Sequence, residues 1–245
     1  ELGNGVDFKS KNAAVQVPSL SGMTAIATGD DDPMALKCDG TVWTWGYGGD
    51  GELGNGSSNA LNNVPGKITT LSGVTAIAGG FYHEMALKAD GTVWSWGNNQ
   101  DGEAGNGTAR GADSPMPVSG LTGITKIAVG EDSYPRLALP RAGPLWEWGD
   151  NTNGQLGAGT YGSISGGSSS PTGSSAPVQV LGLGGATLTN LASGKYSTLA
   201  LTSAGRVLEW GDFSYEPLGV SVPILVPKLA LRLVRSLYLV CTASR

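Results

Sequence analysis

The chain has too few of the residues that usually carry chemistry to build a conventional active site. Its 245 residues include one histidine and two cysteines. A Ser-His-Asp triad would have to use His83, and no G-x-S-x-G nucleophile elbow accompanies it. Zinc needs three or four converging ligands, two cysteines make no disulfide framework, and no phosphate or dinucleotide loop occurs. We therefore expect no catalytic residue, no metal and no cofactor.

Charge is also scarce, and most of the chain is acidic. Charged residues make up 14% of the sequence, with a formal net charge of −5. Four of the basic residues lie near the C-terminus, namely Lys228, Arg232, Arg235 and Arg245. Residues 1–227 therefore contain 11 basic and 20 acidic side chains, a net charge of −9. This balance argues against nucleic acid as a partner. The first three of these cations also interrupt the apolar tail, so we expect no membrane span.

Glycine, by contrast, is abundant, and it marks an internal repeat. The chain has 40 glycines. A Trp-Gly pair recurs at intervals of 51, 52 and 62 residues, and a Leu-Gly-x-Gly loop recurs with it. Such a period predicts a propeller, a solenoid or an array. The repeats, all within one domain of residues 1–245, run approximately over 13–56, 64–107, 116–159 and 177–220, with a partial copy in 221–245.

The second repeat indicates the type of secondary structure. Thr75–Gly79, Glu84–Lys88 and Thr92–Trp96 read as short strands, and the last two flank Asp90-Gly91. Asp-Gly between two such runs predicts a hairpin with a type I′ turn. A fourth run, Val64–Ile68, precedes them, with counterparts at 15–17 and 178–181. Four short strands per repeat and no helix predict an all-β fold, a β-propeller, because a β-helix would need shorter rungs.

The ends of the propeller and one of its hairpins depart from this pattern. Pro223–Val240 matches the opening strands of a fifth unit, so we expect four blades and part of a fifth. The chain lacks an initiator methionine and a signal peptide, which suggests a fragment or processed product with open ends that could self-associate. Pro140 and Pro144 flank the third hairpin, which should be weakened or shifted in register.

Three spaced elements recur together in the same order. They are V-x-x-I-A-x-G, A-L-K-x-D-G-T-V-W-x-W-G and G-x-L-G-x-G. In these elements the chain resembles the regulator-of-chromosome-condensation repeat family. It is similar to the bacterial style of that repeat, which includes β-lactamase inhibitory protein II. The resemblance implies a propeller that usually has seven blades, and a secreted or cell-surface bacterial location.

The resemblance also implies a function in binding rather than catalysis. Family members engage a protein partner through loops on one propeller face, and aromatic loop residues are suitable interface anchors. The expected partner-binding residues are Tyr47, Phe81, Tyr82, His83, Tyr134, Tyr196, Phe213 and Tyr215. The tryptophans Trp45, Trp96, Trp148 and Trp210 should instead form the structural core. A structural repeat module without a partner, guanine-nucleotide exchange and β-lactamase inhibition remain alternatives.

One loop has a composition of its own. Asp30-Asp31-Asp32 follows the first Ile-Ala-x-Gly-like strand and could attract a cation. Three consecutive acids on a turn are more often simply solvated. We therefore expect a solvated loop here, without a metal.

Overall fold

The chain folds into four antiparallel sheets of four strands each. The computed structural model describes residues 3–5, 13–58, 60–130, 135–160, 173–194, 196–212 and 224–229. The strands are β1 (Met23–Thr28), β2 (Pro33–Lys37), β3 (Val42–Gly48), β4 (Ala60–Lys67), β5 (Val74–Gly79), β6 (His83–Lys88), β7 (Val93–Gly97), β8 (Ala112–Pro117), β9 (Ile124–Val129), β10 (Arg136–Pro140), β11 (Trp146–Asp150), β12 (Gly173–Gln179), β13 (Leu188–Ser193), β14 (Ser197–Thr202), β15 (Val207–Gly211) and β16 (Ile224–Leu229).

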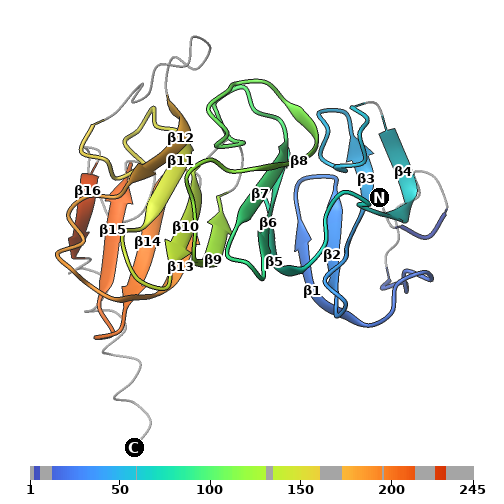
Figure 1. The fold of residues 1–245 in the computed structure, drawn as a ribbon, viewed down its shortest axis with the longest axis horizontal. Helices are drawn as coiled ribbons and strands as arrows, with labels where there is room; N and C mark the ends of the chain where they lie inside the picture. Colours follow the sequence, from blue (N-terminus) through green and yellow to red (C-terminus); the bar gives the residue numbers. More distant parts are fainter. Residues whose placement is uncertain are drawn as a thin grey trace, which may run out of the picture.

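The sheets stand side by side like the blades of an incomplete propeller. Each is a meander in which consecutive strands pair. Figure 1 shows the first strands β1, β5, β9 and β13 on the inner side of the arc and the fourth strands on its outer side. Contacts between successive first strands agree with this arrangement. The predicted all-β propeller of four-stranded units is confirmed, and we call each sheet a blade.

Blade boundaries are offset from the repeats in the sequence. Val64–Ile68, which we expected to open the second repeat, overlaps β4 and closes the first blade. Likewise Ile224–Leu229 forms β16, the last strand of the fourth blade, where we expected a fifth unit to begin. The run Val15–Val17 is not a strand. The remainder of the tail, from residue 230, lies outside the described residues.

The Asp-Gly hairpins form as predicted, but with a different turn. In the first hairpin the Lys37 N–H donates to the Thr41 carbonyl, and the Gly40 N–H donates to the Lys37 carbonyl, both at 2.9 Å. The loop thus has three residues, with glycine in the left-handed region at φ 77°. This is the three-residue loop in which a turn is followed by glycine, rather than the two-residue type I′ turn. The Asp39 carboxylate accepts from the Thr41 N–H and hydroxyl and holds the loop.

Proline weakens the third hairpin without changing its register. Ala138 pairs with Trp146, as the corresponding residues do in the other hairpins. Pro140 stands where Lys88 donates its N–H to the Thr92 carbonyl at 2.9 Å, and the described residues show no equivalent bond in the third turn. Of the two expected outcomes, the register does not shift, and the missing N–H accounts for the other, a weaker hairpin.

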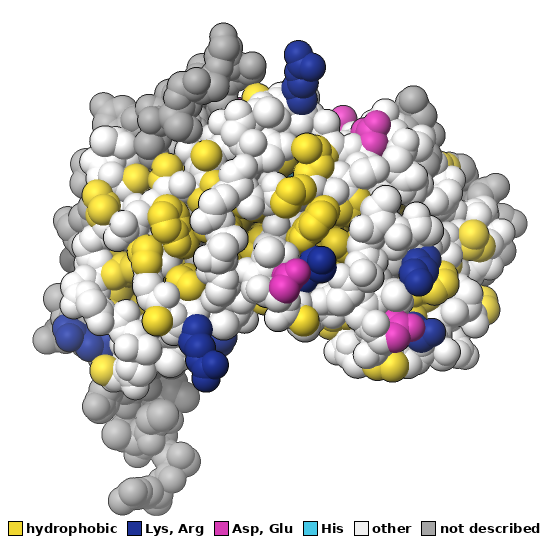
Figure 2. All heavy atoms as spheres, in the orientation of Figure 1, with side chains coloured by type: hydrophobic (Ala, Val, Ile, Leu, Met, Phe, Trp, Pro, Cys, Tyr) yellow, Lys and Arg dark blue, Asp and Glu magenta, His cyan; other side chains and the backbone are white. Residues whose placement is uncertain are grey.

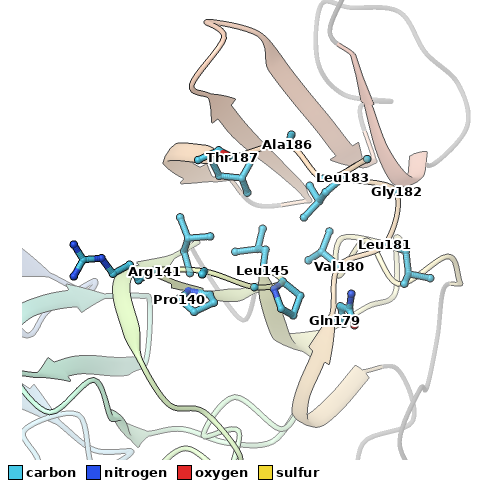
Figure 3. A pocket seen from close by; sticks show the side chains of 17 residues that line it. Pro140, Arg141, Leu145, Gln179, Val180, Leu181, Gly182, Leu183, Ala186 and Thr187 are labelled. Atoms are coloured by element: carbon cyan, nitrogen blue, oxygen red, sulfur yellow. The ribbon is translucent and has the colours of Figure 1, made fainter.

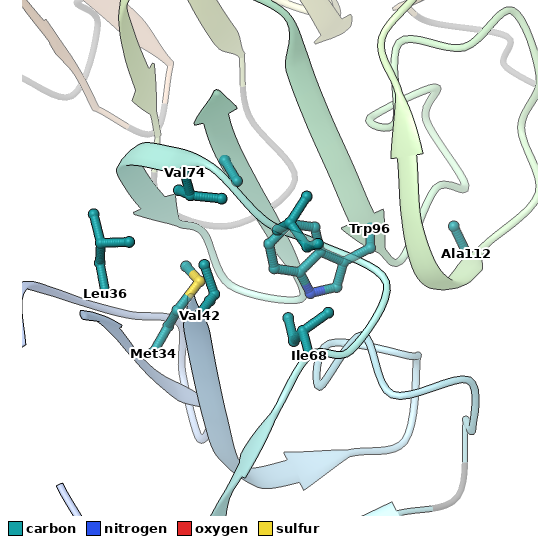
Figure 4. Packing of buried hydrophobic residues seen from close by; sticks show 9 residues of the cluster. Met34, Leu36, Val42, Ile68, Val74, Trp96 and Ala112 are labelled. Atoms are coloured by element: carbon teal, nitrogen blue, oxygen red, sulfur yellow. The ribbon is translucent and has the colours of Figure 1, made fainter. Parts of the chain in front are cut away.

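Three hydrophobic clusters fill the spaces between blades. In the first, Met34 and Val42 of the first blade meet Val74 and Trp96 of the second, and Ile68 of the connecting segment completes the cluster (Figure 4). The other two junctions are built in the same way. All four repeat tryptophans are buried, with exposed fractions of 7%, 1%, 0% and 0% in chain order. Burial between blades, rather than within one sheet, thus holds the arc together.

The two glycine-containing signatures of the repeat contact each other across a junction. A Cβ atom on Gly105 would lie 2.7 Å from Nε1 of Trp148, and Gly54 stands in the same relation to Trp96. The Trp148 N–H donates to the Glu103 carbonyl at 2.8 Å. Leu-Gly-x-Gly and Trp-Gly therefore recur together because the glycine of one blade leaves room for the indole of the next.

Adding a methyl group at Gly105 should destabilise the chain more than adding one at Gly107. Both glycines have positive φ, at 62° and 85°, so alanine costs about 1–2 kcal/mol in backbone strain at either position. Only Gly105 would also press on Trp148, since nothing lies within 4 Å of a Cβ on Gly107. We expect Gly105→Ala to lower the free energy of unfolding by about 1–3 kcal/mol more than Gly107→Ala. Urea denaturation of both variants measures the difference, and equal losses would contradict the contact.

The far side of the fourth blade is less covered than its counterparts. Leu201 is 40% exposed, whereas the corresponding Leu36, Leu87 and Leu139 are 3%, 4% and 7% exposed. Each of the latter three packs in a cluster beneath the next blade. Self-association through this face stays a prediction.

Candidate functional site

The two sets of loops expected to bind a partner lie at the same end of the blades and are bonded together. In the first blade the Tyr47 N–H donates to the Asp31 carbonyl at 3.0 Å. Gly46, between the core tryptophan and Tyr47, makes this contact possible: its φ is 97°, and a Cβ would lie 2.0 Å from the Asp31 oxygen. The same bond recurs in the second and fourth blades. The Trp-Gly signature therefore fixes the loop after the third strand against the loop after the first.

A cleft lies where these loops meet at the first junction, between blades one and two. Its volume is about 160 Å³. It is lined by Asp30, Asp31, Asp32, Tyr47, Glu52, Phe81 and Tyr82. Three of the aromatic residues named from the sequence thus surround one hollow, together with the aspartate loop. We call this hollow the acidic–aromatic cleft.

The aromatic walls of the cleft are held by their neighbours. The rings of Phe81 and Tyr82 pack edge to face, with centroids 4.3 Å apart. Tyr47 lies over Gly49, where a Cβ would come within 2.1 Å of the phenol oxygen. Tyr47 and Tyr82 remain 49% and 38% exposed. Large aromatic surfaces that are both positioned and accessible are suited to binding a partner.

Two buried acids, Asp32 and Glu52, line the cleft, and a third, Glu84, interacts with Asp32. Asp32, Glu52 and Glu84 are 4%, 1% and 0% exposed. One oxygen of Glu52 accepts from the Asp50 N–H at 2.8 Å. Within the described part of the chain, the other Glu52 oxygen, one oxygen of Asp32 and both of Glu84 lack a donor. Asp32 is therefore not part of a solvated loop, although Asp30 and Asp31 are exposed.

Burial raises the pKa values of two of these acids. Burial raises the pKa of Asp32 to about 7, and the Glu52 carboxylate acts in the same direction. The pKa of Glu84 is raised well above its usual value by burial and then by Asp32. Since ionised carboxylates only accept hydrogen bonds, Asp32 and Glu84 can bond to each other only when one of them is protonated. The raised pKa values favour the protonated form of one of these acids near neutral pH.

The second junction places an arginine where the first has Glu84. Arg136 has the same position in its blade, paired with the core tryptophan, and is 0% exposed. Burial lowers its pKa to about 9, while Glu103, Asp101 and Asp150 raise it. The guanidinium is therefore cationic at neutral pH, and the charges of these three acids stabilise it.

His83 lies beneath the surface rather than on it. Its side chain is 1% exposed, and burial, together with the charge of Arg136, lowers its pKa well below the usual value. The structure corrects the sequence expectation that this side chain faces a partner. Tyr196 is half-buried at the same end of the fourth blade. Tyr134, Phe213 and Tyr215 lie outside the described residues.

Sequence reasoning missed the buried charges. Glu52 and Glu84 were not expected in the site, and neither was Arg136. A signal was present, because Glu84 and Arg136 precede a Met-Ala-Leu or Leu-Ala-Leu strand at a position next to apolar core residues. A charged residue at the start of an apolar core strand indicates a specific charged or polar neighbour in the fold, because burying an unpaired charge is unfavourable.

A second hollow lies at the opposite end of the blades, at the third junction. Figure 3 shows it between the proline-containing hairpin and the segment 179–188. Its volume is about 590 Å³. At the first two junctions Val74 and Ile124 donate an N–H to the hairpin glycine carbonyl at 3.1 Å, and no such bond joins Leu188 to Gly143 in the described structure. The connecting segment also has two more residues between Leu183 and Leu188 than its counterparts. The altered turn and the longer connection together leave this space open.

The face of the molecule in Figure 2 shows few other candidate groups. In the view of Figure 2, charged side chains are sparse and scattered, hydrophobic atoms gather over the middle of the molecule, and no histidine is visible. Within the described ranges, no three His, Cys, Asp or Glu side chains are placed to hold a metal ion. The same ranges contain no helix long and apolar enough to cross a membrane.

Comparison with known proteins identifies the repeat. The family model described as "Regulator of chromosome condensation (RCC1) repeat" matches residues 39–87, 90–133 and 142–201. The chain is 35% identical over 207 residues to RCC1 domain-containing protein RUG3, mitochondrial, of Arabidopsis thaliana, covering 81% of this chain and 44% of that protein. It is 33% identical over 199 residues to human Probable E3 ubiquitin-protein ligase HERC6, covering 80% and 19%. The chain thus spans less than half the length of these relatives.

A solved structure shows the same fold. The yeast RCC1 (Prp20) chain bound to Kap60 superposes with a TM-score of 0.70 at 22% identity, covering 86% of this chain and 50% of that one. The family model matches more than half of the residues, in three successive repeats. The chain therefore belongs to the regulator of chromosome condensation (RCC1) repeat family.

Proposed function

We propose that the chain is a non-enzymatic scaffold that binds a protein partner through the loop face of its propeller. The observation that carries this proposal is the acidic–aromatic cleft, where Tyr47 and Tyr82 are exposed beside a hollow lined by acidic residues. Its walls are fixed by backbone hydrogen bonds between the loops. Such pre-organisation lowers the entropy lost on binding.

The organisation of the relatives is consistent with this role. RCC1 repeats occur in chains with different names, including a ubiquitin ligase and a mitochondrial protein, and one solved chain of the fold is bound to another protein, Kap60. Proteins with very different names share this fold. This is expected of a binding module in which the loops, and not the fold, determine the partner. Guanine-nucleotide exchange and β-lactamase inhibition would each be one form of such binding. A purely structural module would have no dedicated partner.

Removing the exposed tyrosines should abolish most of the binding. Peptides selected against the wild-type chain from a random displayed library serve as the probe. Tyr47→Ala/Tyr82→Ala should weaken their affinity at least about thirtyfold, because aromatic anchors at the centre of an interface contribute about 2 kcal/mol or more. Fluorescence anisotropy measures the affinity.

The matched control removes exposed apolar side chains from the outer strands. Val64 and Met116 are 52% and 40% exposed on the fourth strands of their blades. Val64→Ala/Met116→Ala should leave the affinity unchanged. If both double variants bind like the wild type, or if selection yields no binding peptide, the loop face is not a binding surface.

A further inference from the structure

The three blade junctions differ at two equivalent positions that face each other. One position precedes the apolar part of the second strand and is occupied by Glu84, Arg136 or Thr198. The other lies in the loop after the third strand of the preceding blade, where a side-chain oxygen accepts a backbone N–H two residues earlier. Glu52, Glu103 and Gln155 occupy it. The residues at these two positions give each junction a different combination of charges.

Only the first junction has an acid at both of these positions. The second combines Glu103 with Arg136, and the third combines Gln155 with Thr198. The first combines Glu52 with Glu84 and adds Asp32. Within the described residues, no lysine or arginine influences the pKa of these three acids. The first junction therefore has the acid that the second junction has, but it lacks the arginine that faces that acid at the second.

The acids of the first junction lie at a cleft with aromatic walls. Asp32 and Glu52 line the cleft, and each has one oxygen without a donor in the described structure although it is more than nine-tenths buried. Above them stand Tyr47, Phe81 and Tyr82. The volume of about 160 Å³ corresponds to about five water molecules, which suits one long side chain and not a folded element. Aromatic faces also attract cations.

We propose that the acidic–aromatic cleft binds an arginine side chain of the partner protein, whose guanidinium takes the role that Arg136 has at the second junction. The inference rests on the proposed binding function of the loop face and specifies its ligand chemistry. Arginine suits the site because its planar group stacks on aromatic rings and donates to two carboxylates at once. Exposed Asp30 and Asp31 at the rim add attraction for a basic segment.

The direct test compares two peptides that have uncharged flanking residues and differ only in one side chain, arginine or citrulline. The probes are acetyl-Gly-Gly-Tyr-Arg-Gly-Gly-amide and its citrulline counterpart, which keeps the shape and loses the charge. Titration into the full chain, followed by NMR chemical shifts, should give at least tenfold tighter binding of the arginine peptide, weakening as salt is added. Equal binding of the two peptides would overturn the proposal.

Matched variants locate the charge effect. Asp32→Asn/Glu52→Gln should reduce the affinity for the arginine peptide to that of the citrulline peptide. Asp39→Asn/Asp90→Asn removes the same number of charges from the exposed hairpin turns at the opposite end and should change the affinity less than twofold. A thermal melt verifies that each variant folds. Equal losses in both double variants would show a general effect of net charge and contradict the cleft.

The pH dependence gives an independent readout. Asp32 is faced by Glu84 from β6, Glu52 from the β3–β4 loop and Asp30 in its own loop. A bound guanidinium favours the ionised form of this group, so affinity for the arginine peptide should rise about threefold or more from pH 6 to pH 8. A flat profile would contradict contact with Asp32. If selected peptides depend on Tyr47 and Tyr82 yet contain no arginine, the proposed function stands and this inference fails.

Discussion

Trp96→Ala should lower the free energy of unfolding by about 3–5 kcal/mol, the range for truncating a large aromatic side chain in a core. Trp96 is 1% exposed and packs against Met34, Val42 and Ile68 (Figure 4). Its indole N–H donates to the Glu52 carbonyl at 2.7 Å. Alanine leaves both a cavity between blades and a buried carbonyl without its donor.

Trp94 provides the control in the same strand. It is only partly buried, and its indole N–H donates to the Thr92 hydroxyl at 3.2 Å. The centroid of its ring lies 5.3 Å from the Lys88 ammonium nitrogen. Trp94→Ala should therefore cost less than half as much as Trp96→Ala. Urea denaturation followed by circular dichroism measures both, with Trp96→Phe as a milder substitution if the alanine variant does not fold. A loss below about 1 kcal/mol for Trp96→Ala would contradict its role as the junction core.

The sequence predicted the blades because the residues that build them recur. Trp-Gly requires a glycine at positive φ after the tryptophan, as at Gly46 (φ 97°) and Gly97 (φ 96°). The Leu-Gly-x-Gly loop requires a glycine beneath the next indole, as at Gly105. Both needs recur at nearly the same spacing from blade to blade, so that spacing reveals the fold. Which strand closes which blade depends on long-range pairing, and the sequence analysis did not predict it.

The candidate site was predicted only in part, for a different physical reason. Tyr47 and Tyr82 were found because exposed aromatic residues in loops stand out from their neighbours. Glu84 and Arg136 occupy positions that differ from blade to blade, and their importance lies in what faces them across a junction. Those pairs are 32 and 33 residues apart in sequence, Glu52 with Glu84 and Glu103 with Arg136, so one sequence without the fold could not match them. His83 illustrates the reverse error, because a loop position suggested exposure and the blade packing buries it.

The buried acids should make the chain less stable as pH rises from about 5 to 8. Unfolded Asp and Glu titrate near pH 3.9 and 4.3. In the folded chain the pKa of Asp32 is about 7 and that of Glu84 is raised well above its usual value, in both cases chiefly through burial. The folded state therefore holds protons that the unfolded state releases, so stability is greatest below pH 4 to 5 as far as these groups are concerned. It is lost as pH rises through the folded pKa values.

Asp32 alone should account for a loss on the order of 2–3 kcal/mol in unfolding free energy between pH 5 and pH 8, since each unit of pKa shift corresponds to about 1.4 kcal/mol, and Glu84 adds to the loss in the same direction. Asp32→Asn/Glu84→Gln removes both titrating groups and keeps their approximate shape. Its unfolding free energy, from urea titrations at several pH values, should fall less steeply than that of the wild type. Glu147, whose pKa is also raised by burial, leaves a residual slope in both.

Asp39→Asn/Asp90→Asn separates this effect from a general loss of negative charge. The pKa values of these two turn aspartates are lowered, first by hydrogen bonds from Thr41 and Thr92, so both are ionised in the folded and unfolded chain from pH 5 to pH 8. Their removal should shift the stability profile without changing its slope. Parallel profiles for the wild type and Asp32→Asn/Glu84→Gln would instead mean that the first junction holds no proton, and that its acids are ionised and solvated. If the profiles differ as expected, the acids at the first junction lower stability once they ionise, and adding the arginine peptide at pH 8 should restore stability in the wild type alone.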